Sequence, residues 1–94
     1  QSKLMVLHAA YKLENKLDFI SEVSMAKHFV ANSLWKITDR AIQVHGAKGV
    51  TDDTILSTYY RHERAARIYD GADEVHKSRL ARSILKKYSA KMEK

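Results

Sequence analysis

The chain contains no cysteine and no proline, and only three of its 94 residues are glycine. The absence of cysteine excludes a disulfide framework and a thiolate metal site. Without proline, glycine is the main residue that can break a helix, and the glycines occur at only two places, residues 46–49 and 71. Long, uninterrupted helices are therefore possible over most of the sequence. No run of 18 apolar residues is present, which excludes a membrane-spanning helix.

The remaining composition is typical of one small globular domain. Hydrophobic residues make up 45% of the chain and charged residues 30%, which is unlike a disordered protein. A chain of this length buries only a modest core. Because it begins at Gln1, without a methionine or a signal-peptide cleavage site, we expect a fragment, a processed chain or a trimmed form.

Apolar residues recur every three or four positions, which is typical of amphipathic helices. The spacing predicts helices over approximately residues 3–16, 23–45, 54–68 and 75–88, with a short connection over 47–53. Asp18 or Ser21 is expected to cap the second helix and Asp53 the third, because their side-chain oxygens can accept hydrogen bonds from free N–H groups. Gly46 is expected to end the second helix in a left-handed conformation. The sequence thus predicts an all-α fold over residues 1–94, an antiparallel helical bundle or part of one.

Two segments that contain glycine are candidates for a functional site. Asp70 directly precedes Gly71 between two helices, where the backbone can turn sharply and present a carboxylate. Gln43 lies three residues before Gly46, in a turn where backbone N–H groups can approach an anion without a Cβ in the way. By spacing alone, an Asp-Gly turn and a glycine that ends a helix are both common local structures without a function.

Considered together, the segments Gln43-Val44-His45-Gly46-Ala47 and Arg67-Ile68-Tyr69-Asp70-Gly71 resemble the C-terminal helical domain of flavin-dependent acyl-CoA dehydrogenases. The resemblance extends over the entire chain and is most specific between Asp39 and Arg82. It is to the branch of the family in which the catalytic base is aspartate and not the usual glutamate.

The resemblance implies a role for each candidate residue. Asp70 is the expected catalytic base, which removes the α-proton of an acyl-CoA thioester. The expected contacts to flavin adenine dinucleotide (FAD), held mainly by another subunit, are Gln43, Gly46, Ala47 and Glu74. The expected substrate-pocket residues are Tyr69 and Gly71. From the residues alone, Tyr69 is equally consistent with a core position, and Glu74 with an acid favoured by the dipole of a helix N-terminus.

Several ligand-facing positions depart from the family pattern. The family usually has glycine at Ala47, an aromatic residue at Val50 and threonine at Ala72, which leaves Ala72 without a hydroxyl. The side chain of Asp70 is one methylene shorter than glutamate, so it must start roughly 1–1.5 Å nearer the substrate. Asp70 therefore indicates either an adjusted pocket or an impaired enzyme, because small errors in position are costly for catalysis.

The resemblance also implies the context of the site. The family oxidises fatty acyl-CoA between the α and β carbons, passes a hydride to FAD and assembles as homodimers or tetramers. This chain matches the later part of the last domain, without its first helix and without the β domain. We therefore expect the isolated chain to be inactive and not to bind FAD tightly. The expected compartment is the cytoplasm if the protein is bacterial, and the mitochondrion or peroxisome if it is eukaryotic; substrate chain length stays open.

Two other classes of function stay open. The departures from the family pattern favour a non-catalytic helical interaction or oligomerisation module, whereas Asp70 and Gln43 favour the enzyme. The net charge of +6 invites a nucleic-acid interpretation, but the charge pattern is scattered and we expect no nucleic-acid partner. The five histidines lack the paired spacing of a metal site, and none is expected. Helices that normally pack on further structure should leave an apolar patch, so the isolated chain should self-associate.

Overall fold

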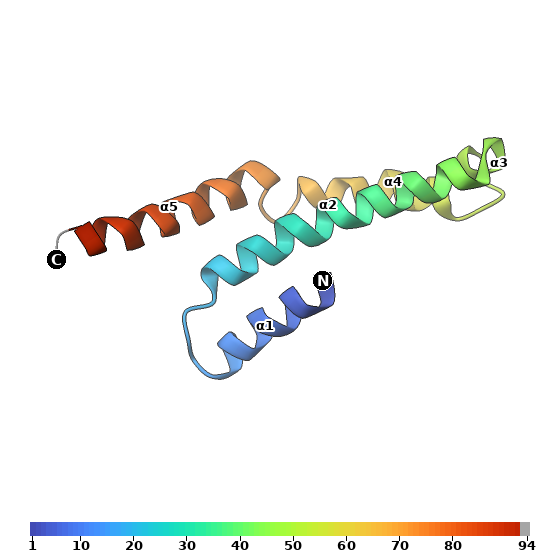
Figure 1. The fold of residues 1–94 in the computed structure, drawn as a ribbon. Helices are drawn as coiled ribbons and strands as arrows, with labels where there is room; N and C mark the ends of the chain where they lie inside the picture. Colours follow the sequence, from blue (N-terminus) through green and yellow to red (C-terminus); the bar gives the residue numbers. More distant parts are fainter. Residues whose placement is uncertain (93–94) are drawn as a thin grey trace.

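The computed structural model describes residues 1–92, which form an all-α fold, as the sequence predicts (Figure 1). The elements are α1 (Ser2–Glu14), α2 (Ile20–His45), α3 (Ala47–Val50), α4 (Leu56–Arg64), the 3-10 helix η1 (Ala65–Arg67) and α5 (Asp73–Met92). None of the helices described is both long and apolar enough to cross a membrane.

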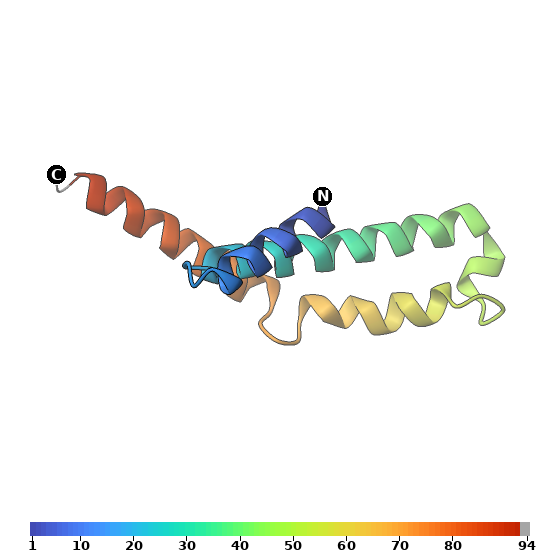
Figure 2. The same cartoon turned by 90° about the horizontal axis from the view of Figure 1, so that it is seen from below.

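Helix α2 is the axis of the molecule, and α1, α4 and α5 all pack against it. Figures 1 and 2 show that these three helices run antiparallel to α2: α1 lies along its N-terminal half, α4 along its C-terminal half, and α5 extends past its start. The result is elongated, with extents of 60 × 25 × 21 Å. The arrangement is therefore part of a bundle, not a closed one.

The position at which α2 ends follows the prediction, and the segment after it does not. Gly46 directly follows the last residue of α2 and has a positive φ of 65°, but its ψ of −146° differs from that of the predicted left-handed helical conformation. The expected connection after it contains the short helix α3, which folds back on α2. Gly49 explains this close packing, because a Cβ there would lie 2.7 Å from the main-chain oxygen of Ile42.

The predicted caps have mixed outcomes. The N–H of Ile20, the first residue of α2, donates to Asp18 Oδ1 at 3.2 Å, which confirms Asp18 as a partner of this helix end. Asp53 does not cap the next helix, which begins two residues later than predicted. Instead, the N–H of Leu56 donates to Thr54 Oγ1 at 3.4 Å. Thr54, one residue closer to the start of α4 than Asp53, makes the contact.

The buried apolar core is thin and made of small side chains, Ala9, Ala26, Ala31 and Ala66. Alanine at these positions lets the helices approach closely. Large apolar side chains instead remain accessible: Leu4 is 70% exposed, Val44 85% and Leu85 68%. Helix packing here leaves much of the apolar surface uncovered, as the sequence predicts.

Candidate functional site

Asp70 lies in a turn between η1 and α5. The preceding 3-10 helix ends as the N–H groups of Ile68 and Tyr69 both donate to the main-chain oxygen of Ala65, at 2.8 and 3.0 Å. Asp70 and Gly71 then adopt φ angles of 50° and 91°, and these two positive values in succession redirect the chain into α5. The side chain of Asp70 is exposed, and no residue among 1–92 donates a hydrogen bond to its carboxylate.

Lys27 of α2 contacts this turn from one side. Its Nζ donates hydrogen bonds to the main-chain oxygens of Ala66, Tyr69 and Gly71, the last two at 3.0 and 3.3 Å. The same ammonium lies 5.4 Å from the centroid of the Tyr69 ring, which is a cation–π distance. Lys27 thus joins the long central helix to the backbone on both sides of Asp70.

His76 of α5 contacts the turn from the other side. It is only 6% exposed; its Nε2 lies 3.3 Å from the main-chain oxygen of Asp70, and its Nδ1 lies 3.4 Å from Ser24 Oγ. A Cβ on Gly71 would lie 2.7 Å from His76 Nε2. Glycine is therefore favoured at this position both by its backbone angle and by the close approach of His76.

The first residue of α5, Asp73, is a buried acid that sequence reasoning missed. It is 3% exposed, and its Oδ2 accepts hydrogen bonds from Arg67 Nε at 2.8 Å and Asn32 Nδ2 at 3.0 Å. His28 Nδ1 lies 3.3 Å from its other oxygen. Burial raises the pKa of Asp73, but the hydrogen bonds from Arg67 and Asn32, together with the nearby His28, outweigh it and lower the pKa to about 2. The carboxylate of Asp73 is therefore ionised, bound by Arg67 and Asn32, and a poor base.

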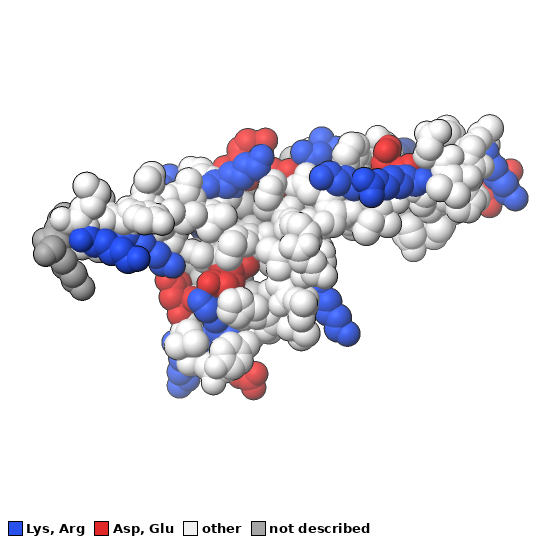
Figure 3. Space-filling view, viewed as in Figure 1, with Lys and Arg blue, Asp and Glu red and all other residues white. Residues whose placement is uncertain are grey.

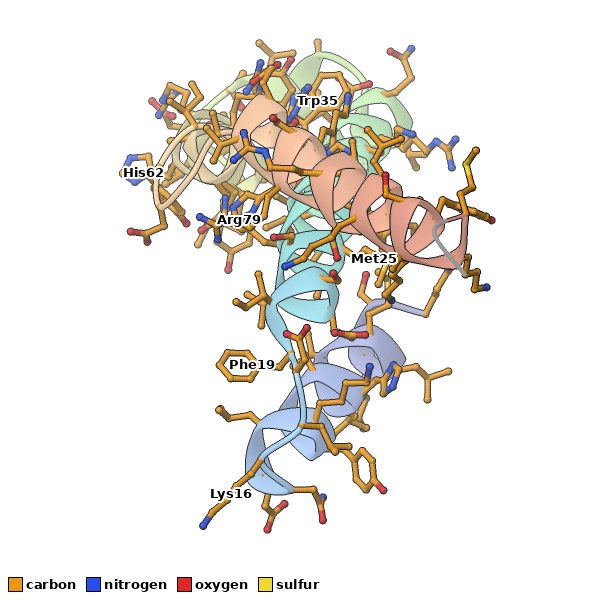
Figure 4. All side chains as sticks on the ribbon, turned by 90° about the vertical axis from the view of Figure 1, so that its left-hand side faces the viewer. Lys16, Phe19, Met25, Trp35, His62 and Arg79 are labelled. Atoms are coloured by element: carbon orange, nitrogen blue, oxygen red, sulfur yellow. The ribbon has the colours of Figure 1, made fainter. Side chains whose placement is uncertain are left out.

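Aromatic packing completes the support of Arg67. Its guanidinium lies 5.6 Å from the centroid of the Trp35 ring. Trp35, which is labelled in Figure 4, in turn packs against Tyr60 of α4 with the ring centroids 6.3 Å apart. The Arg67–Asp73 pair is thus held between α2, η1 and α5.

The other predicted residues divide between two places. Tyr69, Gly71 and Glu74 lie with Asp70, Tyr69 half exposed and Glu74 exposed in the first turn of α5. Gln43, Gly46 and Ala47 are all exposed at the far end of α2, where α3 begins.

The structure does not bring these two groups together within one chain. Residues 27 and 43 of α2, one beside each group, are about 24 Å apart at the rise of an α-helix. At the far end, a Cβ on Gly46 would meet nothing within 4 Å, so its backbone is open to a ligand. Ala47 has no positive φ and begins α3, so alanine fits there without strain.

An apolar cavity of about 440 Å³ adjoins the turn. Its lining includes Val6 and Ala9 of α1, Val23 and Val30 of α2, and Tyr69. Metal ligands are not gathered here: among residues 1–92, no group of three histidine or acidic side chains could hold an ion.

The charged surface does not single out another site. On the face seen in Figure 3, lysine and arginine side chains spread from the end of α5 to the tip at α3, with acidic groups between them. They do not gather into one basic surface on that face.

The all-α fold and the Asp-Gly turn define a helical domain of the kind found at the C-terminus of acyl-CoA dehydrogenases. The family model described as "Acyl-CoA dehydrogenase, C-terminal domain" matches residues 1–85. The chain belongs to the acyl-CoA dehydrogenase family, which confirms the family resemblance of the sequence.

Individual relatives agree with this assignment. The chain is 39% identical over 85 residues to a 3-(aryl)acrylate reductase of Clostridium sporogenes, a match covering 90% of this chain and 22% of the relative. It is 51% identical over 63 residues to FadE2 of Mycobacterium tuberculosis, named as an acyl-CoA dehydrogenase, covering 67% and 16% respectively. A solved structure from Mycobacterium abscessus, which is named as an acyl-CoA dehydrogenase, superimposes with a TM-score of 0.90 at 40% identity. The match covers 94% of this chain and 22% of that one. The chain therefore spans about a fifth of the length of these proteins.

Proposed function

We propose that the chain is the C-terminal part of a flavin-dependent acyl-CoA dehydrogenase in which Asp70 is the catalytic base. The observation that carries the proposal is the contrast between two aspartates three residues apart. The carboxylate of Asp73 is buried and held by Arg67 and Asn32, whereas that of Asp70 is exposed on a turn supported by its backbone. Of these two aspartates, only Asp70 has a carboxylate that a substrate can reach.

In this proposal Asp70 acts on the carbon next to the thioester carbonyl. Its carboxylate accepts the α-proton, and the electron pair of that C–H bond becomes the second bond between the α and β carbons. The chemistry that bound FAD would supply is an acceptor for the hydride that leaves the β carbon. The side chain of Asp70 must be within hydrogen-bond reach of the α-proton, so the turn sets the geometry of the step.

Gln43, Gly46 and Ala47 would contact the pyrophosphate region of FAD. The open space at Gly46 fits this role, because an anion can approach the backbone there. Residues 27 and 43 of α2, one beside each group, lie about 24 Å apart along the helix, and this separation supports a flavin shared between subunits. Glu74, beside the base, would reach the ribose or adenine of the flavin that faces Asp70.

The proposal is tested by Asp70→Asn in the full-length protein. We expect loss of acyl-CoA dehydrogenation with FAD still bound, because the amide keeps the shape of the side chain and cannot accept the proton. Asp53→Asn, an exposed aspartate in another loop, is the matched control and should keep full activity. Turnover by Asp70→Asn at the wild-type rate would remove Asp70 from this role.

A second candidate is reduction of an α,β-unsaturated acid or thioester, because the relative from Clostridium sporogenes is named as an acrylate reductase. Asp70 would then give a proton to the α carbon, and the hydride for the β carbon would have to come from a bound reduced flavin. Assays of the full-length protein in both directions separate the two, and Asp70→Asn should abolish either reaction.

The alternative from another class is a non-catalytic interaction module on the same scaffold. The exposed large apolar side chains favour it, as do Ala47, Val50 and Ala72. It predicts that the full-length protein carries no flavin absorbance band and shows no turnover with any acyl-CoA.

A further inference from the structure

Lys27 lies opposite the turn that carries Asp70, and we propose that it is the positioning residue for this base. The proposal rests on the proposed function, because it assigns Lys27 an effect on proton removal by Asp70. Lys27 would not touch the substrate itself. It would act by fixing the backbone from which the carboxylate projects.

The three hydrogen bonds of Lys27 enclose Asp70 in sequence. The acceptors belong to Ala66 and Tyr69 before it and to Gly71 after it. An ammonium group has three N–H donors, so each donor of Lys27 has one acceptor. The peptide groups on both sides of Asp70 are therefore tied to the same atom.

Within residues 1–92, no backbone N–H donates to these three acceptors. The Ala66 oxygen lies near the end of η1, where helix carbonyls lack intrahelical donors, and the Tyr69 and Gly71 oxygens lie in the turn that follows. A cation at such an end is also favoured by the helix dipole. Lys27 satisfies these carbonyls from α2, which is the longest helix described and contacts every other helix.

The turn is held from two neighbouring elements. Asp70 has a φ of 50°, a region that is uncommon for residues other than glycine, although aspartate adopts it more often than most. His76 approaches the main-chain oxygen of Asp70 from α5, so Lys27 and His76 hold the turn from two elements. Removing the ammonium leaves one of these supports and allows the carboxylate to move.

The test compares variants of the full-length enzyme with FAD bound. Lys27→Met keeps the length of the side chain and removes the charge and the donors; Lys27→Arg keeps both. Lys36→Met is the matched control, since Lys36 is exposed on the same helix. The measurement is the rate of flavin reduction at saturating acyl-CoA, with hydrogen and then deuterium at the α carbon.

We expect Lys27→Met to reduce flavin about 10–100-fold more slowly, the effect of moving a catalytic group by about 1 Å. The α-deuterium isotope effect should rise, because proton removal becomes slower relative to other steps, while KM changes little. Lys27→Arg should recover most of the rate, and Lys36→Met should match wild type. A loss of stability alone would lower the amount of active enzyme without changing the isotope effect.

Asp70→Asn, measured in parallel, separates the two proposals. If Asp70→Asn is inactive and Lys27→Met has the wild-type rate and isotope effect, the role of Lys27 is overturned and the proposed function stands. If Asp70→Asn keeps turnover, both fall. Should Lys27→Met not accumulate as folded enzyme, Lys27→Gln replaces it: an intermediate rate with a raised isotope effect supports the proposal, and the wild-type rate overturns it.

Discussion

Asp70 and Asp73 are chemically identical and differ only in their surroundings. Asp73 is buried among groups from α2 and η1, while Asp70 is exposed at a positive φ. Sequence alone can place an aspartate before a glycine at a helix break. It cannot show that the side chain of Asp73 accepts hydrogen bonds from a distant part of the chain, because Asn32, one of the donors, is 41 residues away.

The ionisation of Asp73 should stabilise the fold in a pH-dependent way. Its pKa is lowered to about 2 in the folded state, below the ordinary value of 3.8. A lowered pKa stabilises the folded state above the unfolded value, and this contribution of about 2 kcal/mol is lost as the pH falls from about 5 to 2. Asp73→Asn should therefore be less stable than wild type at pH 7, and the difference should shrink below pH 4. Denaturant unfolding across this range measures it, and a constant difference would contradict the role.

Gly71 is the second residue whose replacement has a defined physical consequence. Gly71→Ala strains the backbone at φ 91° and places a Cβ 2.7 Å from His76 Nε2. Gly46→Ala is the control, because Gly46 also has a positive φ but open space around it. Both should lower the free energy of unfolding by about 1–3 kcal/mol through strain.

The collision with His76 should add a further cost of about 1–3 kcal/mol to Gly71→Ala alone. In a His76→Ala background this extra cost should disappear, which a double-mutant cycle measures. Equal costs for Gly71→Ala and Gly46→Ala would show that His76 yields without penalty.

At the scale of elements, periodicity predicted the four main helices because each has an apolar face that repeats every three or four residues. The errors lie where local signals compete. Asp53 and Thr54 are both good capping residues, and only the folded backbone decides between them. Helix α3 was missed because the cause, the packing of Gly49 on Ile42, is a tertiary contact.

Among the described elements, helix α1 packs substantially only against α2, so its stability depends on that one interface. Lys12 Nζ donates to Glu22 Oε1 at 2.6 Å across this pair, and this hydrogen bond lowers the pKa of Glu22. Glu22→Gln should lower the stability of the α1–α2 pair by about 0.2–1 kcal/mol at neutral pH. Hydrogen exchange should be faster in α1 and unchanged in α4. Equal increases in the hydrogen-exchange rates of α1 and α4 would mean that the Lys12–Glu22 contact does not act locally.

At the scale of the whole molecule, the chain is more open than a compact domain of its size. Its radius of gyration is 17.3 Å, against about 12 Å expected for a compact chain of this length. Its accessible area is 7388 Å², against about 5,500 Å² expected from its mass. The excess, about 1,900 Å² on one chain, is more than the roughly 800 Å² that one partner buries in an interface of standard size.

The isolated chain should therefore associate. The exposed side chains include Leu4, Leu7 and Tyr11 on α1 and Ile84 and Leu85 on α5. Burial of such surface favours self-association as concentration rises. Light scattering over a concentration series measures this, with the full-length protein as the comparison. A monomer at every concentration would contradict the prediction.

The length of α2 has a genetic consequence under the proposed function. If one chain's base meets a flavin held at the Gln43 end of another chain, then two different inactive subunits can repair each other. Mixed dimers of Asp70→Asn and Gln43→Ala subunits would contain one active centre with both lesions and one with neither. Two alleles that each abolish activity would complement when expressed together.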